Sequence, residues 1–352
     1  MSRKLLVTGG AGFIGCNFVH YWLKSHPRDE VVVLDALTYA GNRASLAAAE
    51  DNPSFTFVHG DINDTALVEK LLRERLLDTI VHFAAESHVD RSITGPDAFI
   101  ETNVLGTHSL LKAARTVWLA GDGVPHRFHH VSTDEVYGSL EPDAPAFTEQ
   151  HQYQPNSPYS ASKAASDHLV RAYHHTYGLE VTTSNCSNNY GPFHFPEKLI
   201  PLAITNLLLG KEVPIYGDGK NIRDWLYVED HARGIEAVLE NGVSGEVYNI
   251  GGHNELDNLT LLEVLCKSLD RKFADDPDLA GRYPLAPPAK GLPCSSKLVF
   301  VKDRAGHDRR YSINAEKLRR ELGFEIAVYF EEGVSRTTDW FLANPQWWRQ
   351  QL

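Results

Sequence analysis

The strongest indication of the fold comes from residues 5–15, Leu5-Leu6-Val7-Thr8-Gly9-Gly10-Ala11-Gly12-Phe13-Ile14-Gly15. An apolar run typical of a buried strand comes first, and an apolar helical pattern follows the glycines through Leu23. Glycines permit a tight turn and let the backbone approach a pyrophosphate at the N-terminus of the helix. A glycine triplet alone can be only a flexible turn, but this one lies between the strand and the helix that a dinucleotide site requires.

A second strand, residues 31–34, ends in Asp35, twenty residues after Gly15. A carboxylate at this place accepts hydrogen bonds from ribose hydroxyls and repels a 2′-phosphate, so the sequence predicts NAD as the cofactor rather than NADP. The alternative interpretation of Asp35 is a helix cap or a turn residue.

Further strands are predicted at residues 55–58, 79–83, 128–131 and 181–183, with helical patterns between most of them. This alternation predicts an α/β fold with a doubly wound, Rossmann-type parallel sheet and right-handed crossovers. Asp61 follows the third strand and could face an adenine edge or cap the helix predicted at residues 65–75. The small residues Ala84 and Ala85 end the fourth strand, where a dinucleotide could pass close to the backbone.

The most informative polar residues follow the strand at residues 128–131. Thr133, Asp134 and Glu135 come directly after it, and ligands of open α/β sheets bind just beyond the carboxyl ends of the strands. Tyr159 and Lys163 begin a helical pattern about two dozen residues later, and their i, i+4 spacing places them on one helix face. We expect the ammonium to lower the pKa of the Tyr159 phenol and make it a base usable near neutral pH.

Asp134 and Glu135 together suggest more than a plain dehydrogenase. Once a hydroxyl has been oxidised, the carbon beside the new ketone is acidic, and an ionised Glu135 could take its proton. A protonated Asp134 could give a proton to a hydroxyl leaving the next carbon, because paired carboxyl groups in unlike environments can hold opposite protonation states. The pair alone, which is common at the start of a polar loop, would not justify an elimination.

From Pro192 onward, interleaved prolines, lysines and arginines predict a smaller second domain. We expect an NAD-binding Rossmann domain at residues 1–190, with returning segments at about 224–254 and 311–327. A C-terminal substrate-binding domain would comprise residues 191–223, 255–310 and 328–352. Residues 270–293, rich in Asp and Pro, are predicted to be loop-like. Residues 303–310 form a compact charged loop whose arginines suit a diphosphate, unless it is only a solvated turn.

Composition excludes several classes of function. The 352 residues carry a formal net charge of −12, which argues against general binding to nucleic acid or to an anionic membrane. Four scattered cysteines without a C-x-x-C pair fit a reducing cytoplasm better than a disulfide framework. The adjacent pairs His129-His130 and His174-His175 direct their rings apart in regular structure, so we expect no metal site. The sequence shows no apolar signal core and no run of membrane-spanning length.

Several longer motifs carry a family resemblance: residues 82–90 (HFAAESHVD), 132–138 (STDEVYG), 186–201 (CSNNYGPFHFPEKLIP), 222–231 (IRDWLYVEDH) and 306–310 (GHDRR). Over nearly its whole length the chain resembles the extended short-chain dehydrogenases/reductases and, among them, the dTDP-D-glucose 4,6-dehydratase family. The resemblance implies conversion of dTDP-D-glucose to dTDP-4-keto-6-deoxy-D-glucose and water, with NAD reduced and reoxidised within one turnover.

In that family a Thr-Tyr-Lys group oxidises C4, a Glu takes the C5 proton, an Asp protonates the 6-hydroxyl, and hydride returns to C6. By motif these roles fall on Thr133, Tyr159, Lys163, Glu135 and Asp134.

The resemblance also implies which residues bind each ligand. NAD would be held by Gly9, Gly12, Phe13, Ile14, Gly15, Asp35, Ala36, Leu37, Thr38, Asp61, Ile62, Ala84, Ala85, Ser87, Thr102, Tyr159, Lys163 and Asn189. The sugar nucleotide would be held by Ser87, Thr133, Asn188, Lys198, Leu199, Pro214, Ile215, Tyr216, Arg223, Asn258, Asp303, Arg304 and His307. On the residues alone, Asn188 and Asn189 could equally be turn residues. The sequence does not separate recognition of thymine from that of uracil.

Two positions depart from the family pattern. Ala36 stands where a Lys commonly follows the ribose-binding Asp, and Ala305 replaces the usual Pro of the charged loop. Neither touches the catalytic group. Homodimers built from two helices per subunit are usual in the family, and the helices predicted at residues 103–119 and 159–177 are the candidates.

Two other hypotheses compete with the dehydratase. A nucleotide-sugar 4-epimerase or decarboxylase on the same fold would have no use for the adjacent Asp134 and Glu135. An NAD-sensing binding protein without activity would have no need of an intact Thr133, Tyr159 and Lys163.

Overall fold

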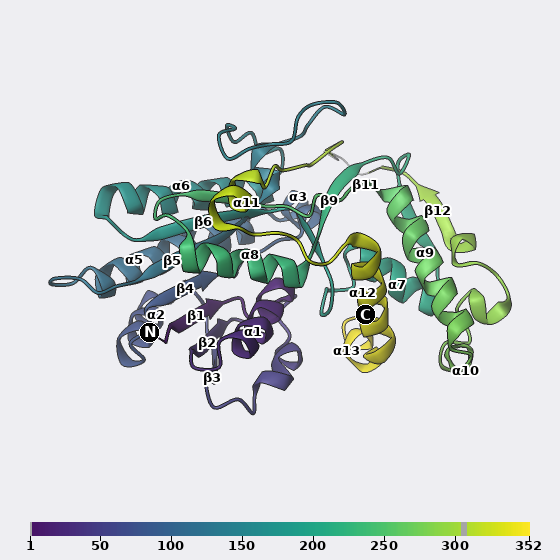
Figure 1. Cartoon of the computed structure of the whole chain (residues 1–352), viewed down its shortest axis with the longest axis horizontal. Helices are drawn as coiled ribbons and strands as arrows, with labels where there is room; N and C mark the ends of the chain where they lie inside the picture. The colour runs from purple at the N-terminus through teal and green to yellow at the C-terminus, as the bar shows by residue number, and fades with distance from the viewer. Residues whose placement is uncertain (1, 304–307) are drawn as a thin grey trace.

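The computed structural model describes residues 2–303 and 308–352, and a seven-stranded parallel sheet lies at its centre (Figure 1). The strand order is β10-β6-β5-β4-β1-β2-β3. The strands are β1 (Lys4–Thr8), β2 (Glu30–Asp35), β3 (Phe55–His59), β4 (Thr79–His82), β5 (Arg127–Thr133), β6 (Val181–Cys186) and β10 (Val247–Ile250). The predicted doubly wound, Rossmann-type sheet is thus confirmed, and β10 adds a strand from beyond residue 190 to it.

Helices cover both faces of this sheet (Figure 1). One layer holds α1 (Phe13–Ser25), α8 (Val228–Asn241) and α11 (Glu316–Leu322), and the other holds α2 (Thr65–Glu74), α5 (Thr107–Trp118) and α6 (Pro158–Tyr177). Side chains of a strand alternate between its faces. Leu5 and Val7 therefore pack in one core with Trp22, while Leu6 packs in the other with Leu110. Burial on both faces explains the continuous apolar runs that identified the strands.

Strands β1 and β4 are neighbours in the sheet. From β1 the chain adds β2 and β3 on one side, and from β4 it adds β5 and β6 on the other, so the strand order reverses between them. Beyond the carboxyl ends of two such strands, the connecting loops leave in opposite directions and open a crevice. The glycine loop after β1 and the residues after β4 and β5 all lie at this edge. The fold therefore brings together the motifs that the sequence separates by more than a hundred residues.

The remaining elements surround a third core that includes Leu207, Leu265 and Phe341. A three-stranded sheet has the order β11-β9-β7, and β12 pairs in parallel with β8. These strands are β7 (Asn188–Tyr190), β8 (Val213–Tyr216), β9 (Ile222–Tyr227), β11 (Glu255–Asp257) and β12 (Leu298–Val301). The helices are α7 (Leu199–Leu208), α9 (Asn258–Asp275), α10 (Asp278–Arg282), α12 (Phe330–Ala343) and α13 (Pro345–Arg349). Shorter segments are η1 (Arg43–Ala49), α3 (Val89–Thr94), α4 (Asp97–Phe99), η2 (Ile100–Gly106), η3 (Asp134–Tyr137), η4 (Pro288–Lys290) and η5 (Cys294–Lys297).

The prediction of a loop at residues 270–293 is wrong over its first part. Helix α9 extends to Asp275, and the short helix α10 follows at once. Leu261, Leu265 and Leu269 are fully buried at helical spacing, so the acidic turn at the end of α9 continues an apolar stripe. The Asp-rich composition reflects the solvent-facing side of a helix, which looks like a loop when only composition is considered.

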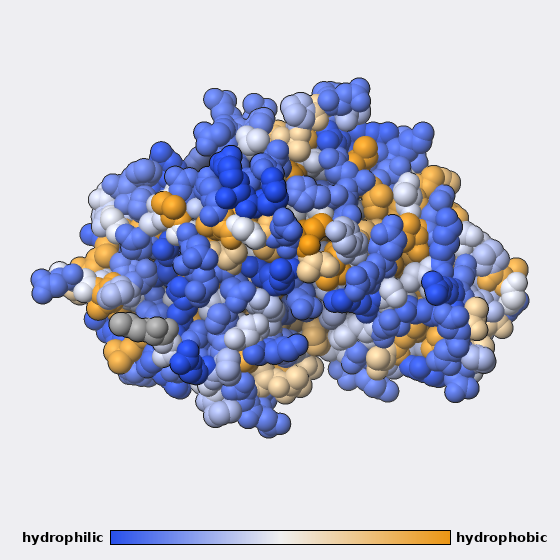
Figure 2. Space-filling model, in the orientation of Figure 1, coloured by the Kyte–Doolittle hydropathy of each residue, from blue (hydrophilic) through white to orange (hydrophobic). Residues whose placement is uncertain are grey.

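On the face seen in Figure 2, hydrophilic residues predominate and hydrophobic ones form small patches between them. Of the helices within residues 2–303 and 308–352, none combines the length and apolar character needed to span a membrane. The four cysteines are all buried and free.

Candidate active site

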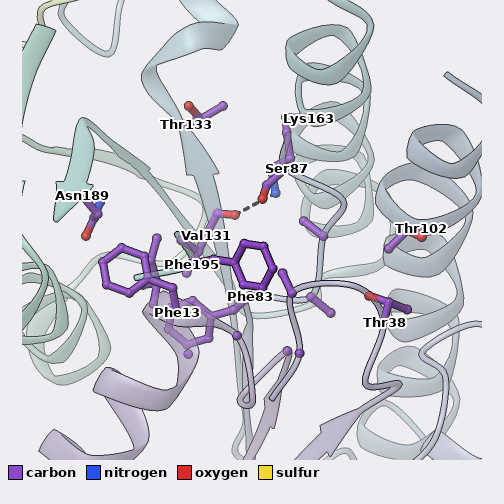
Figure 3. Close-up of a pocket in the computed structure, with 18 of the residues that line it drawn as sticks. Phe13, Thr38, Phe83, Ser87, Thr102, Val131, Thr133, Lys163, Asn189 and Phe195 are labelled. Carbon is purple, nitrogen blue, oxygen red and sulfur yellow. Dashed lines mark hydrogen bonds between the residues drawn. The ribbon is translucent and has the colours of Figure 1, made fainter. Parts of the chain in front are cut away.

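A cavity opens at the carboxyl edge of the large sheet, between the strand ends and the segment that follows β7 (Figure 3). All five predicted catalytic residues line it, although they come from β5, η3 and α6. Most of the predicted ligand-binding residues line it too: Gly9, Gly12, Phe13, Ile14, Gly15, Asp35, Ala36, Thr38, Asp61, Ile62, Ala84, Ala85, Ser87, Thr102, Asn188, Asn189, Lys198 and Leu199.

The glycine loop gives this cavity an anion-binding edge. Helix α1 begins after Gly12, which offers no capping side chain, and its first turn contains no acidic residue. The first backbone N–H groups of a helix have no partner within the helix and carry partial positive charge, so they are available to a pyrophosphate. Gly9 has a φ of +69°, and a Cβ there would lie 2.5 Å from the Ala84 backbone nitrogen. The residues present therefore fit a dinucleotide.

Gly15→Ala is expected to destabilise the protein and weaken NAD binding together. A Cβ at this position would lie 2.3 Å from the Gly9 carbonyl oxygen, so the loop or the helix must shift. Overpacking of this kind costs about 1–3 kcal/mol. Thermal unfolding and calorimetric titration with NAD would measure both effects. Gly281→Ala is the matched control because no atom lies within 4 Å of its Cβ position, and equal behaviour of the two variants would contradict the prediction.

Asp35 is held firmly at the end of β2. Its Oδ2 accepts a hydrogen bond from the Ala11 N–H at 2.8 Å, and its Oδ1 accepts one from the Leu37 N–H at 2.8 Å. Burial raises the pKa of the Asp35 carboxyl, and these two N–H donors oppose that rise. The carboxylate thus braces the glycine loop against β2 while it lines the cavity.

Asp61 is not the cap of α2. Asp64 fills that position by accepting from the Leu67 N–H at 3.0 Å. Asp61 instead lines the cavity and accepts a hydrogen bond from the Asn63 N–H at 2.8 Å. Of the two interpretations of Asp61, the structure therefore removes the helix cap.

Tyr159 and Lys163 share one face of α6, as their spacing predicts, but the expected electrostatics are wrong. The Lys163 ammonium donates to the Val131 carbonyl oxygen at 2.8 Å, as the dashed line in Figure 3 shows. The pKa of Tyr159 is raised well above its usual value, mainly by burial and then by the negative charge of Glu135. A hydrogen bond with Thr133 works in the opposite direction. Burial and a neighbouring carboxylate thus outweigh any lowering by the ammonium.

The two acidic residues have unlike environments. Thr133 caps η3 by accepting from the Glu135 N–H at 3.3 Å, which holds Asp134 and Glu135 at the strand end. Asp134 is only 2% exposed, and burial followed by the charges of Glu135 and Asp224 raises its pKa well above the usual range. Asp134 is therefore the member of the pair whose environment favours the protonated form. Glu135 is half-buried beside it.

The two asparagines differ in what they can offer a ligand. The Asn189 amide donates to the Ser187 carbonyl at 2.9 Å, and its oxygen pairs with His231 Nδ1 at 2.9 Å, so the protein already engages both ends. Asn188 is half-buried and lines the cavity. Lys198 donates to the Ser87 carbonyl at 3.3 Å, which joins the second half of the chain to the residues after β4.

Seven predicted ligand-binding residues do not line this cavity: Leu37, Pro214, Ile215, Tyr216, Arg223, Asn258 and Asp303. Six of them gather around β8, β9 and the start of α9. Ile215 is only 2% exposed and belongs to the third core. Arg223 donates to the Asp308 carbonyl at 3.0 Å and lies over the Tyr311 ring at 4.3 Å. Arg304 and His307, like Ala305, fall outside the described residues.

Five residues that were not predicted from the sequence, four aromatic and one acidic, also line the cavity: Tyr39, His194, Phe195, Glu197 and Trp225. His194 stacks on Phe13 at 4.1 Å, and Phe195 meets Tyr39 edge-on at 6.0 Å. Glu197 forms ion pairs at 3.6 Å with Arg91 and, when that ring is protonated, with His88. The HFPEK run within residues 194–198 was quoted only as a family motif, and nothing in its spacing shows that it folds back over the glycine loop.

The histidine pairs do not form a metal site. The rings of His129 and His130 point to opposite faces of β5, where His129 contacts Thr182 and Ser184 and His130 contacts Asp167. Within residues 2–303 and 308–352, no cluster of three or more His, Cys, Asp or Glu side chains could hold a metal ion.

The chain is similar over most of its length to several known proteins. The family model described as GDP-mannose 4,6 dehydratase matches residues 6–337. The dTDP-glucose 4,6-dehydratase of Xanthomonas campestris pv. campestris strain B100 is 55% identical over 97% of this chain and 94% of its own length. The dTDP-glucose 4,6-dehydratase 1 of Escherichia coli K12 is 52% identical over 98% of this chain and 94% of its own length.

Solved structures agree with the sequence comparison. DesIV, a dTDP-glucose 4,6-dehydratase from Streptomyces venezuelae solved with NAD bound, matches with a TM-score of 0.88 and 49% identity over 99% of this chain and all of its own. A UDP-glucose 4-epimerase from Thermotoga maritima shares the fold with a TM-score of 0.81 at 26% identity over 97% of this chain and all of its own. The fold alone is thus common to both activities, and the sequence identity separates them. The chain belongs to the dTDP-glucose 4,6-dehydratase family.

Proposed function

We propose that Thr133, Asp134, Glu135, Tyr159 and Lys163 carry out the family's reaction in this chain. As a member of that family, the chain is an NAD-dependent hydro-lyase that converts dTDP-D-glucose to dTDP-4-keto-6-deoxy-D-glucose and water. The observation that carries the residue roles is that a buried Asp134 and a half-buried Glu135 line the same cavity as Tyr159.

NAD, when bound, would supply the hydride acceptor for C4 oxidation and the hydride donor for C6. The chain's own residues place it. The N–H groups at the start of α1 receive the pyrophosphate, and Asp35 receives the ribose hydroxyls. The ring stack of Phe13 and His194 lies beside the same loop.

Tyr159 takes the proton of the C4 hydroxyl, and Thr133 donates a hydrogen bond to the oxygen that becomes the ketone. The high pKa of the Tyr159 phenol makes its anion a strong base, but one that forms only when positive charge is near. Lys163, when protonated, provides positive charge one helical turn away. Its hydrogen bond to the Val131 carbonyl fixes where that charge lies.

The acidic pair then removes water across C5 and C6. Glu135 takes the C5 proton that the C4 ketone has made acidic, and Asp134 gives its proton to the departing 6-hydroxyl. Burial and the Glu135 charge both raise the pKa of Asp134, which suits Asp134 as the acid and Glu135 as the base. A 4-epimerase requires neither proton transfer, so the adjacent Asp134 and Glu135 at this cavity favour the dehydratase.

The direct test is turnover by the purified protein with dTDP-D-glucose and no added NAD. NMR of the product is expected to show the 4-keto-6-deoxy sugar. Appearance of dTDP-galactose would indicate the epimerase instead, and binding without any product would indicate an inactive NAD-binding protein.

Asp134→Asn is expected to slow loss of water by about 10²–10⁴-fold while C4 oxidation and C5 proton exchange continue. Asparagine keeps the size of the side chain but cannot give up a proton, and general acids contribute about that factor. In deuterated water, the substrate should gain deuterium at C5 before product forms. Loss of C5 exchange in this variant would contradict the role, because Glu135 is still present.

We also propose that the substrate-side residues around β8, β9 and α9 hold the nucleotide, with Arg223 nearest the acidic pair. The Arg223 charge opposes the rise in the Asp134 pKa, which supports a position of Arg223 near the acidic pair. The predicted two-domain division accords with this arrangement. The third core draws its residues only from position 190 onward, whereas the other two pack on the large sheet.

A homodimer and a cytoplasmic location complete the proposal. Ile93, Ile100 and Leu105 are 49%, 48% and 53% exposed along α3 and η2, beside α6. Exposed apolar side chains in one region suit the two-helix interface usual in the family. Leu105→Glu should then yield monomers in sedimentation analysis. Four buried free cysteines suit a reducing compartment.

A further inference from the structure

Asp167 lies one turn beyond Lys163 on α6 and is only 5% exposed. Its Oδ1 pairs with His130 Nε2 at 3.0 Å, and its Oδ2 accepts a hydrogen bond from the Ser132 hydroxyl at 2.8 Å. Tyr153 also forms a side-chain hydrogen bond with it. Burying a carboxylate is costly, and these three partners offset part of that cost.

His130 and Ser132, the two strand residues that contact Asp167, flank Val131. Side chains at i and i+2 of a strand point to the same face, so His130 and Ser132 both face α6. The Val131 carbonyl between them accepts the hydrogen bond of the Lys163 ammonium at 2.8 Å. Asp167 and Lys163 therefore fasten two successive turns of α6 to three consecutive residues of β5. Those residues lead directly into Thr133, Asp134 and Glu135.

Lys163 and Asp167 are also opposite charges in a place from which water is excluded. Lys163 is 4% exposed, and the Asp167 charge opposes the lowering of its pKa by burial. Burial shifts the pKa of the five groups on other elements that interact with Lys163 or Asp167 away from ionisation, so they are neutral near pH 7: His82, His130, Tyr137, Cys186 and Tyr153. Glu135, the charged group on η3, acts on Tyr159 and Asp134 instead. His168, the other titratable neighbour, is exposed to solvent on α6.

We propose that Asp167 is a positioning residue for the reaction. It fixes α6 against the end of β5 and supplies the buried negative charge that keeps Lys163 an ammonium. This inference rests on the proposed role of Lys163 and adds a residue that does not line the cavity.

The test is the pH dependence of kcat in Asp167→Asn. Asparagine keeps the shape of the side chain but removes the charge, so Lys163 should lose its proton at lower pH. The alkaline limb of the profile is expected to move to lower pH by about one unit or more, the usual effect of losing a close opposite charge. Asp167→Glu, which restores a carboxylate, should return the limb toward its wild-type position.

Ser132→Ala is the matched control, since it removes one hydrogen bond to Asp167 and leaves the charges of Asp167 and Lys163. The alkaline limb of its kcat profile should stay at the wild-type pH, even if kcat itself changes. An unmoved limb in a folded Asp167→Asn variant would overturn the proposal and leave Asp167 a purely structural residue. In the same assay, absence of turnover by the wild type would instead refute the proposed function itself.

If Asp167→Asn does not fold, the double variant Asp167→Asn with Lys163→Met tests the proposal instead. The expected cause of the misfolding is the buried Lys163 ammonium that has lost its opposite charge. Removing that ammonium should restore folding, as judged by circular dichroism and thermal unfolding. Failure of the double variant to fold would show that the carboxylate is needed without regard to Lys163, which also overturns the proposal.

Discussion

Glu135→Gln is expected to oxidise C4 yet form product about 10²–10⁴-fold more slowly than the wild type. Glutamine has nearly the same size but cannot accept the C5 proton, and a general base contributes about that factor. In deuterated water the recovered substrate should carry no deuterium at C5, which distinguishes this variant from Asp134→Asn. Proton NMR of the sugar nucleotide measures both the exchange and the product.

The substitution has a second expected effect, on Tyr159. The Glu135 charge raises the pKa of the phenol, so its removal should let Tyr159 ionise at lower pH. The acid limb of C4 oxidation should then move to lower pH. Glu141→Gln, a change at an exposed carboxylate, is the control and should leave both measurements unchanged. Full turnover by Glu135→Gln would refute the role assigned to this residue.

Tyr159→Phe is expected to lose C4 oxidation itself, again by about 10²–10⁴-fold. Phenylalanine fills the same buried space, including the edge-on contact with Phe99 at 6.2 Å, so the fold should survive. Because the C5 proton is acidic only after C4 is oxidised, C5 exchange and loss of water should fall with it. Single-turnover absorbance of reduced nicotinamide would follow the first step.

Tyr177→Phe, at the exposed end of the same helix, controls for the loss of a phenol. It should behave as the wild type. C5 exchange at the wild-type rate in Tyr159→Phe would show that another group removes the C4 hydroxyl proton, and the account of the oxidation step would be wrong.

The sequence predicted the parts of the site that are determined locally. The glycine loop, Asp35 and the Thr133–Glu135 run each follow a strand, and parallel strands bring their carboxyl ends to one edge. That rule alone placed residues far apart in the sequence in a single cavity. The doubly wound sheet followed from the same alternation of strands and helices.

What the sequence missed depends on tertiary packing. The stack of His194 on Phe13 arises where the segment after β7 folds back, and no local pattern records it. The Tyr159 pKa was predicted in the wrong direction because a helix spacing shows the nearby ammonium but not the burial or the Glu135 charge. The contacts of Asp167 with His130 and Ser132 likewise arise only when α6 packs on β5.

The claim on which the account depends is that one cavity oxidises C4 and later returns the same hydride to C6. It is tested most directly with dTDP-D-glucose deuterated at C4, incubated with the purified protein in ordinary water. The account predicts that deuterium NMR of the product will find the label at C6. Product that carries no deuterium at C6, with the label lost to solvent or to added NAD, would contradict it.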